Sequence, residues 1–108
     1  MMDLWRTKNN SWALFMGHLV IEKLLKALYI SKMNEHPPMI HDLRRICNKM
    51  EIELSEKNIR TLDTVSRFNI SARYDDYRRT FYKLCTDSFT IEWISEIKAC
   101  RLWIKKML

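Results

Sequence analysis

The chain has 108 residues, 47% of them hydrophobic, which suits a single domain with one core and is too apolar for a disordered tail. One glycine and two prolines are too few for a β-sandwich or barrel, which needs a turn about every ten residues, so helices are favoured. Nineteen Lys and Arg against thirteen Asp and Glu give a net charge of +6, which attracts phosphate-rich partners, although the interspersed acidic residues also fit simple solubility.

A long helix is predicted over residues 12–33. Asn9, Asn10 and Ser11 are residue types that cap helices, and they come just before a periodic apolar run. At about 100° per residue, the apolar residues of this run fall on one wide arc, which we expect to face the core. They are Leu14, Gly17, Val20, Ile21, Leu24, Leu25 and Leu28.

His18, Glu22 and Lys26 follow one another at i, i+4 spacing on another side of this helix. An ammonium and an imidazole on one face can bind a phosphate and a base. Alternatively, the three residues form a solvated or dimer-facing stripe that is locked by its own Glu–Lys ion pair, since Glu22 precedes Lys26 in the favourable order. Both interpretations stay open at this point.

Residues 34–39 form a predicted connector, because Pro37 and Pro38 cannot continue a helix. A short helix is then expected from His41 to Ile52, with an apolar stripe of Leu43, Ile46, Cys47 and Met50. Asp42 can cap this helix while His41 packs or hydrogen-bonds locally. The functional alternative is an anion site, in which His41 completes the N–H groups at the start of the helix.

The third helix is predicted to begin behind Ser55 and to end near Phe68, with Ile59, Leu62 and Val65 buried. Residues 69–89 are the least regular part of the chain. Tyr77, Phe81 and Leu84 predict at most a short extra turn or helix there.

This irregular segment is also the one place where aromatic and basic residues alternate, as they do in proteins that hold single strands by stacking and phosphate contacts. The alternative is a solvent-facing basic loop whose aromatics pack into the bundle, and Asp75 and Asp76 dilute its charge. The alternating residues are Arg73, Tyr74, Tyr77, Arg78, Arg79, Tyr82 and Lys83.

The last helix is predicted behind a Thr90 cap. Its buried stripe repeats at 4-3-4-3 spacing and consists of Trp93, Ile97, Cys100, Ile104 and Met107. Lys105 and Lys106 favour the C-terminal end of the helix dipole. With no repeat or linker between them, these elements are expected to pack into one helical bundle.

Three cysteines, Cys47, Cys85 and Cys100, are an odd number without CxxC spacing, which predicts neither disulfides nor a zinc site. We expect no metal and no cofactor, because the only glycine, Gly17, lies within a helix and cannot form a phosphate loop. The longest apolar stretch ends at His18, so neither a signal peptide nor a membrane span is predicted. A cytoplasmic location follows as an expectation.

Four pieces of the sequence, taken in order, resemble the HEPN domain family, named for higher eukaryotes and prokaryotes nucleotide-binding. They are the helix Phe15-Met16-Gly17-His18-Leu19-Val20-Ile21-Glu22-Lys23-Leu24-Leu25-Lys26-Ala27-Leu28-Tyr29, then Ile40-His41-Asp42-Leu43, Ala72-Arg73-Tyr74-Asp75 and the closing amphipathic helix. The resemblance covers roughly residues 12–108. It implies a single HEPN-like domain over residues 1–108, folded as an all-α, antiparallel up-and-down bundle of four to five helices. The sequence departs from the family in that its first helix is expected to be shortened. It also implies frequent homodimers and frequent pairing with a minimal nucleotidyltransferase in toxin–antitoxin systems.

HEPN ribonucleases pair an Arg with a His four to six residues further on, and this chain lacks that motif. Only Arg6 precedes any histidine, twelve positions before His18. The resemblance therefore implies a non-catalytic nucleotide-, RNA- or partner-binding module that uses the His18 face and the basic-aromatic segment. The alternatives are an atypical ribonuclease or toxin, with His18 or His41 as acid–base group and Arg73 as phosphate clamp, and a purely structural helical dimer.

Overall fold

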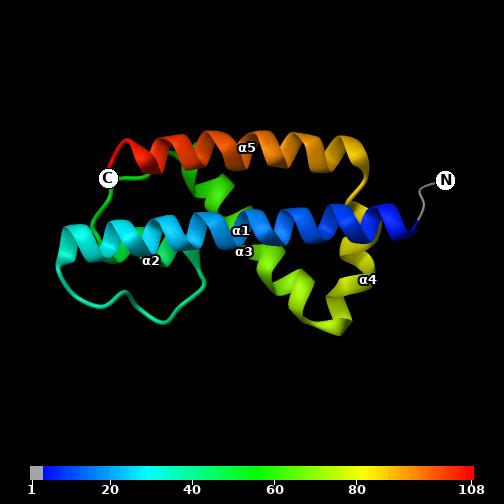
Figure 1. The fold of residues 1–108 in the computed structure, drawn as a ribbon, viewed down its shortest axis with the longest axis horizontal. Coiled ribbons are helices and arrows are strands. Elements are labelled where there is room, and N and C mark those ends of the chain that lie inside the picture. Colours follow the sequence, from blue (N-terminus) through cyan, green and yellow to red (C-terminus); the bar gives the residue numbers. More distant parts are fainter. Residues whose placement is uncertain (1–3) are drawn as a thin grey trace.

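Five α-helices and no strand make up the part of the chain that the structure, a computed structural model, describes, residues 4–108 (Figure 1). The all-α bundle predicted from the sequence is confirmed. The helices are α1 (Leu4–Met33), α2 (Leu43–Lys49), α3 (Glu56–Arg73), α4 (Asp75–Leu84) and α5 (Asp87–Lys105).

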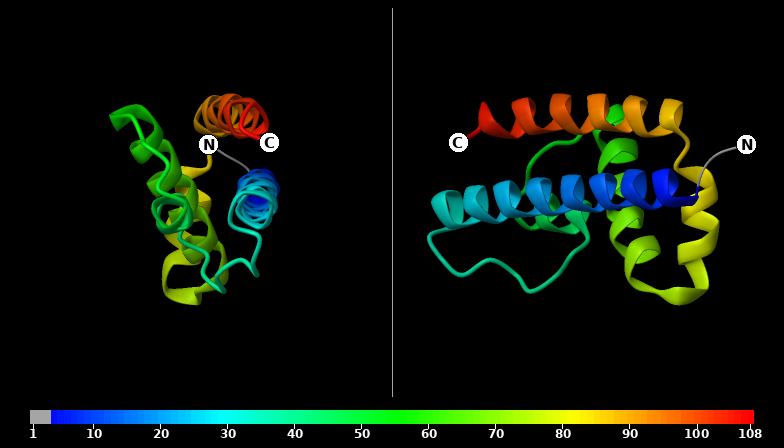
Figure 2. Two further views of the ribbon diagram at one scale, coloured as in Figure 1. Left: turned by 90° about the vertical axis from the view of Figure 1, so that its left-hand side faces the viewer. Right: turned by 45° about the vertical axis from the view of Figure 1, so that its right-hand side comes forward.

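The two longest helices, α1 and α5, lie side by side and run in the same direction (Figures 1 and 2). Accordingly, Gly17 of α1 lies against Ile97 of α5, and further along the pair Leu28 and Met107 line one hollow. The predicted antiparallel, up-and-down arrangement applies to α3 and α4, which form a hairpin across this pair (Figure 2), and not to α1 and α5. Because this hairpin returns the chain to the N-terminal end of α1, α5 starts there and runs parallel to it.

The first helix begins at Leu4 rather than near residue 12, so the predicted cap at residues 9–11 is wrong. These polar residues lie inside α1 and are used there. The Asn10 amide donates to the backbone carbonyl of Cys85 and to the Asp87 carboxylate, both at 3.0 Å. The Ser11 hydroxyl donates to the backbone carbonyl of Lys8 at 2.7 Å. Asn10 is thus used in tertiary contacts and Ser11 in a hydrogen bond within α1, so neither side chain caps the helix.

The short helix α2 is narrower than the predicted range of 41–52. Asp42 caps it as expected, because its side chain accepts a hydrogen bond from the backbone N–H of Arg45. The connector before it covers residues 34–42 and starts at Asn34, whose φ of 54° ends α1 in the left-handed region. Glu51, at φ 57°, turns the chain in the same way after α2.

The irregular segment predicted at residues 69–89 is corrected, since nearly all of these residues are helical, whereas the short helix indicated by Tyr77, Phe81 and Leu84 is confirmed as α4. Ser55 caps α3 as predicted, but this helix continues past Phe68 to Arg73. Tyr74 alone separates α3 from α4. Thr86, not Thr90, caps α5, because the Thr86 hydroxyl accepts from the N–H of Phe89, and Thr90 is buried within the helix. Two equally good cap residues four positions apart cannot be told apart by type.

The core is built mainly from the predicted apolar stripes. Most stripe residues of α1, all four of α2, and Leu62, Val65, Ile97, Cys100 and Ile104 are buried. Val20 is the exception, being 43% exposed. The three cysteines are buried and free, and burial raises the pKa of Cys47 and Cys85 to about 12 and that of Cys100 to about 11. Their thiols therefore stay protonated and pack as small apolar groups.

Gly17 marks the closest approach of α1 and α5. A Cβ at this position would lie 2.7 Å from the Cδ1 atom of Ile97, the end of a flexible side chain. We expect Gly17→Ala to change the free energy of unfolding by less than about 1 kcal/mol, because the helix propensity of alanine offsets the shift of this methyl group. Gly17→Leu should cost about 1–3 kcal/mol by overpacking.

Urea denaturation followed by circular dichroism measures both changes. Ser95→Leu, on the exposed side of α5, is the control and should stay within about 0.5 kcal/mol of the wild type. A Gly17→Leu variant as stable as this control would contradict the close packing of the two helices.

Candidate functional site

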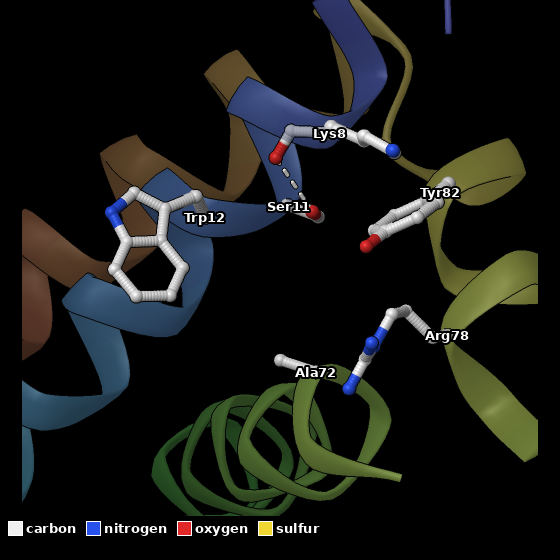
Figure 3. A pocket seen from close by; sticks show the side chains of 6 residues that line it. All are labelled: Lys8, Ser11, Trp12, Ala72, Arg78 and Tyr82. Carbon is white, nitrogen blue, oxygen red and sulfur yellow. Dashed lines mark hydrogen bonds between the residues drawn. The ribbon is translucent and has the colours of Figure 1, made fainter. Parts of the chain in front are cut away.

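A pocket of about 390 Å³ opens between the N-terminal half of α1 and the α3–α4 hairpin (Figure 3). We call it the α1–α4 pocket. Its lining residues are Lys8, Ser11 and Trp12 from α1, Ala72 from α3, and Arg78 and Tyr82 from α4.

The α1 wall of this pocket follows from helix spacing, since Lys8, Ser11 and Trp12 stand at i, i+3 and i+4. The Lys8 ammonium lies 5.8 Å from the centre of the Tyr82 ring, a cation–π distance (Figure 3). Trp12 is 62% exposed, and its ring contacts that of Phe15 at 5.4 Å between centroids. The indole thus contacts a neighbouring ring of α1, while much of the side chain stays open to a ligand.

The opposite wall carries Arg78. One of its guanidinium nitrogens lies 3.2 Å from the Asp75 carboxylate, and another donates to the backbone carbonyl of Arg73 at 3.4 Å. Asp75 is exposed, so this ion pair is weak and open to exchange with another anion. The guanidinium has five N–H donors, which leaves several for a bound group.

The chemistry of the α1–α4 pocket follows from its lining. Two cations and two aromatic rings converge there, and no carboxylate lines the walls. Such a site attracts phosphate and offers a flat surface on which a base can stack. It contains no histidine, so it lacks a side chain whose ordinary pKa suits acid–base catalysis near neutral pH.

The sequence analysis identified the charged and aromatic residues of α4 that line this pocket but not those of α1. It singled out Arg78, and it placed Tyr82 in the same basic-aromatic segment, but it missed Lys8 and Trp12. The reason is the helix start, which was predicted at residue 12 and so left Lys8 outside the helix. Extending the periodic pattern upstream would have placed Lys8 one turn before Trp12 on the same face.

Arg73, Tyr74 and Arg79 do not line the pocket. They are exposed at and beside the turn of the α3–α4 hairpin, next in sequence to the pocket residues Ala72 and Arg78. Tyr74 is the residue between the two helices, and 58% of it is exposed. These three side chains are thus placed to contact a ligand that extends beyond the pocket.

The other four predicted site residues form a separate network around a buried carboxylate. Glu22 accepts hydrogen bonds from His41 Nδ1 at 2.9 Å and from Lys26 Nζ at 3.2 Å. His18 Nε2 lies 3.3 Å from the backbone carbonyl of His41 and 3.6 Å from Glu22 Oε1. The predicted Glu22–Lys26 ion pair is confirmed. The contact of His41 is not local, because it reaches back to α1.

The protonation of this network follows from burial and hydrogen bonding. Burial alone would raise the pKa of Glu22, but the hydrogen bonds and charges of His41 and Lys26 outweigh it and hold the pKa below its usual value. Burial lowers the pKa of His18, which has no exposed surface and is therefore neutral. Its Nε2 then donates to the His41 carbonyl, and its buried Nδ1 has no hydrogen-bond partner.

Two of these residues are accordingly closed to a ligand in this structure. His18 and Glu22 are buried, and Lys26 is bound to Glu22. His41 is half-exposed and is the accessible member. The network therefore joins the connector to α1, and the pocket is elsewhere.

Within residues 4–108, no three His, Cys, Asp or Glu side chains are grouped so that they could hold a metal ion. None of the helices described there has a stretch both long and apolar enough to span a bilayer.

Comparison with known proteins gives one match. The family model described as HEPN domain matches residues 2–107, which is nearly the whole chain. No curated protein and no solved structure matches.

The buried imidazole makes a prediction about pH. Because the pKa of folded His18 lies below its unfolded value of 6.5, its contribution to stability is complete above pH 6.5 and is lost as the pH falls through the folded pKa. Glu22 acts in the same direction, but below its unfolded value of 4.5. Between pH 7 and 5, His18 should therefore lower the stability by at most about 1.4 kcal/mol per pH unit.

The variant His18→Gln isolates this effect, since it retains a donor and does not titrate. We expect it to be less stable than the wild type at pH 7, and the difference should shrink as the pH falls to 5. Urea denaturation at several pH values measures the difference. A gap that stays constant over this range would contradict a neutral, buried His18.

Proposed function

Because the chain belongs to the HEPN domain family, a family of nucleotide- and RNA-related modules, we propose that it binds a nucleotide or single-stranded RNA in the α1–α4 pocket. The observation that carries this proposal is that Lys8 and Trp12 of α1 and Arg78 and Tyr82 of α4 line one hollow whose lining contains no carboxylate.

Each of these groups is suited to contact a different part of a nucleotide. The Lys8 ammonium and the Arg78 guanidinium lie on either side of the Tyr82 ring (Figure 3), and each offers donors to a phosphate. The open indole of Trp12 offers a stacking surface, and a stacked base contributes about 1–3 kcal/mol. Arg73, Tyr74 and Arg79, at the hairpin turn, extend the same surface for a longer strand. The net charge of +6 adds long-range attraction.

The module is proposed to be non-catalytic. The Arg and His pair of the family's ribonucleases is absent from the sequence, and the pocket lining has neither a histidine nor a carboxylate. One observation favours the atypical ribonuclease as a second candidate: the Glu22 carboxylate orients His41 through its Nδ1, and the imidazole is half-exposed, so its Nε2 is the nitrogen left for a substrate. No residue of the α1–α4 pocket belongs to that pair, so the two candidates use different parts of the molecule.

We propose further that the chain forms a homodimer through the outer face of α1. Trp12, Met16, Val20 and Ile30 are exposed along this face, although each is a large apolar side chain. Several large apolar side chains exposed on one face of a helix are typical of an interface, and a two-fold partner can cover them. The family relationship also supports a minimal nucleotidyltransferase as partner in a toxin–antitoxin-type pair. A purely structural dimer is the remaining alternative, and it predicts no ligand.

Binding of a fluorescent single-stranded RNA tests the pocket. Lys8→Ala with Arg78→Ala should weaken binding about tenfold or more and lower the salt dependence by about 0.7 slope units per lost phosphate contact. Trp12→Ala should weaken it about fivefold or more through lost stacking. Asp75→Asn should tighten it a few-fold, because it releases Arg78. The RNA should be recovered intact.

The matched control is Lys105→Ala with Lys106→Ala, which removes the same charge from the C-terminal end of α5. If both double variants lose affinity equally and Trp12→Ala binds as the wild type does, attraction is diffuse and the pocket is not the site. Cleavage of the RNA that His41→Ala abolishes would favour the ribonuclease instead.

Light scattering tests the dimer. The wild type should have twice the 13.2 kDa mass of one chain. Val20→Glu with Ile30→Glu should yield monomers, because two carboxylates are then desolvated in an apolar interface. Ser95→Glu on α5 is the control and should leave the dimer intact. A wild-type protein that stays monomeric at high concentration would refute this proposal.

A further inference from the structure

A second concave surface lies between α3 and α5, apart from the α1–α4 pocket. It consists of two adjoining hollows of about 430 and 170 Å³ that share Lys57, Thr61 and Glu96. We call it the α3–α5 groove. None of its lining residues lines the α1–α4 pocket, and none was singled out from the sequence as part of a site.

The two walls of this groove carry opposite charge. Lys57, Arg60 and Arg67 stand at i, i+3 and i+10 on one face of α3. Glu92 and Glu96 stand at i and i+4 on the facing side of α5. Each wall therefore presents one sign of charge to the space between them.

An aromatic side chain lies between the two walls. Trp93 lines the groove and is half-buried. Its indole meets the rings of Phe68 and Phe89 at centroid distances of 5.7 and 6.4 Å, which fixes its orientation. The groove thus combines cations, carboxylates and a rigid stacking surface.

Among residues 4–108, no ion pair joins the groove's cations to Glu92 or Glu96, although they face one another. Two carboxylates at i, i+4 on a helix also repel each other. A ligand that brings an anion to α3 and hydrogen-bond donors to α5 would give partners to the cations of one wall and to the carboxylates of the other.

We propose that the α3–α5 groove binds a guanine nucleotide. The phosphate lies against Arg60 and Arg67, the base stacks on Trp93, and the guanine N1–H and N2–H₂ groups donate to a carboxylate of Glu92 or Glu96. The proposal rests on the nucleotide-related role proposed above, but not on the α1–α4 pocket.

Guanine is the base that fits because of its Watson–Crick edge. It alone presents two adjacent donors there, which match the two oxygens of a carboxylate. Adenine and cytosine offer one amino group beside a ring nitrogen acceptor, which a carboxylate repels. Uracil offers one N–H between two carbonyl groups. The α1–α4 pocket has no carboxylate in its lining and so has no means to make this distinction.

The test uses GMP, AMP, CMP and UMP as probes, each titrated into the Lys8→Ala, Arg78→Ala protein by calorimetry. This background removes the cations of the α1–α4 pocket, so the remaining signal belongs to the groove. GMP should bind at least about tenfold more tightly than the other three. Arg60→Ala with Arg67→Ala should weaken all four nucleotides.

The Glu92→Gln, Glu96→Gln variant tests the preference for guanine more directly than the arginine variant does. It should abolish the preference for GMP and leave AMP bound as tightly as before or more tightly, because the repulsion between carboxylates and phosphate is removed. A merely structural role of these residues would not raise the affinity for AMP. Circular dichroism confirms that each variant is folded.

Three outcomes would overturn the proposal. They are the absence of GMP binding by the wild type, equal affinity for the four nucleotides, and GMP binding by the wild type that the Lys8→Ala, Arg78→Ala protein has lost. The last outcome would place the nucleotide in the α1–α4 pocket and support the proposed function. Failure of the proposed function is distinct, because RNA affinity would then be unchanged by Lys8→Ala with Arg78→Ala.

Discussion

A carboxylate buried within a helix must find donors, and the fold depends on how Glu22 does so. Its partners are Lys26, one turn further along α1, and His41, at the far end of the connector. This second contact fixes where the connector ends, and α2 begins at once behind the Asp42 cap. The N–H of Leu43 then donates to the Ser66 hydroxyl at 3.0 Å, which joins α2 to α3. One buried charge thereby sets the positions of three helices.

The placement of α3 in turn decides both concave surfaces. Ala72, near its C-terminal end, contributes to the α1–α4 pocket, whereas Lys57, Arg60 and Arg67 form one wall of the α3–α5 groove. The helix crosses one face of the α1–α5 pair, so its N-terminal part lies beside α5 and its C-terminal end lies near α1 (Figure 2). A change in the tilt of α3 would therefore alter both surfaces together.

The sequence predicted the helices well because helical periodicity depends on neighbouring residues. It predicted the sites less well because their residues come from segments that are distant in the chain. The stripes of α2 and α5 appear in the core as expected, and Ser55 and Asp42 cap their helices. His18 was assigned to an accessible face, since helical spacing does not reveal that the connector and α2 lie over that side. Lys8 and Glu92 stood out in no pattern, because each gains its neighbours only from a helix distant in the chain.

Trp12 belongs to two surfaces, since it borders the α1–α4 pocket and also starts the exposed apolar stripe of α1. A second chain on that stripe and a base in the pocket compete for, or share, the same indole. Self-association and ligand binding are then thermodynamically linked, and the coupling is reciprocal. The apparent affinity for the ligand becomes a function of protein concentration, so that the amount of protein in the cell acts as an input to binding.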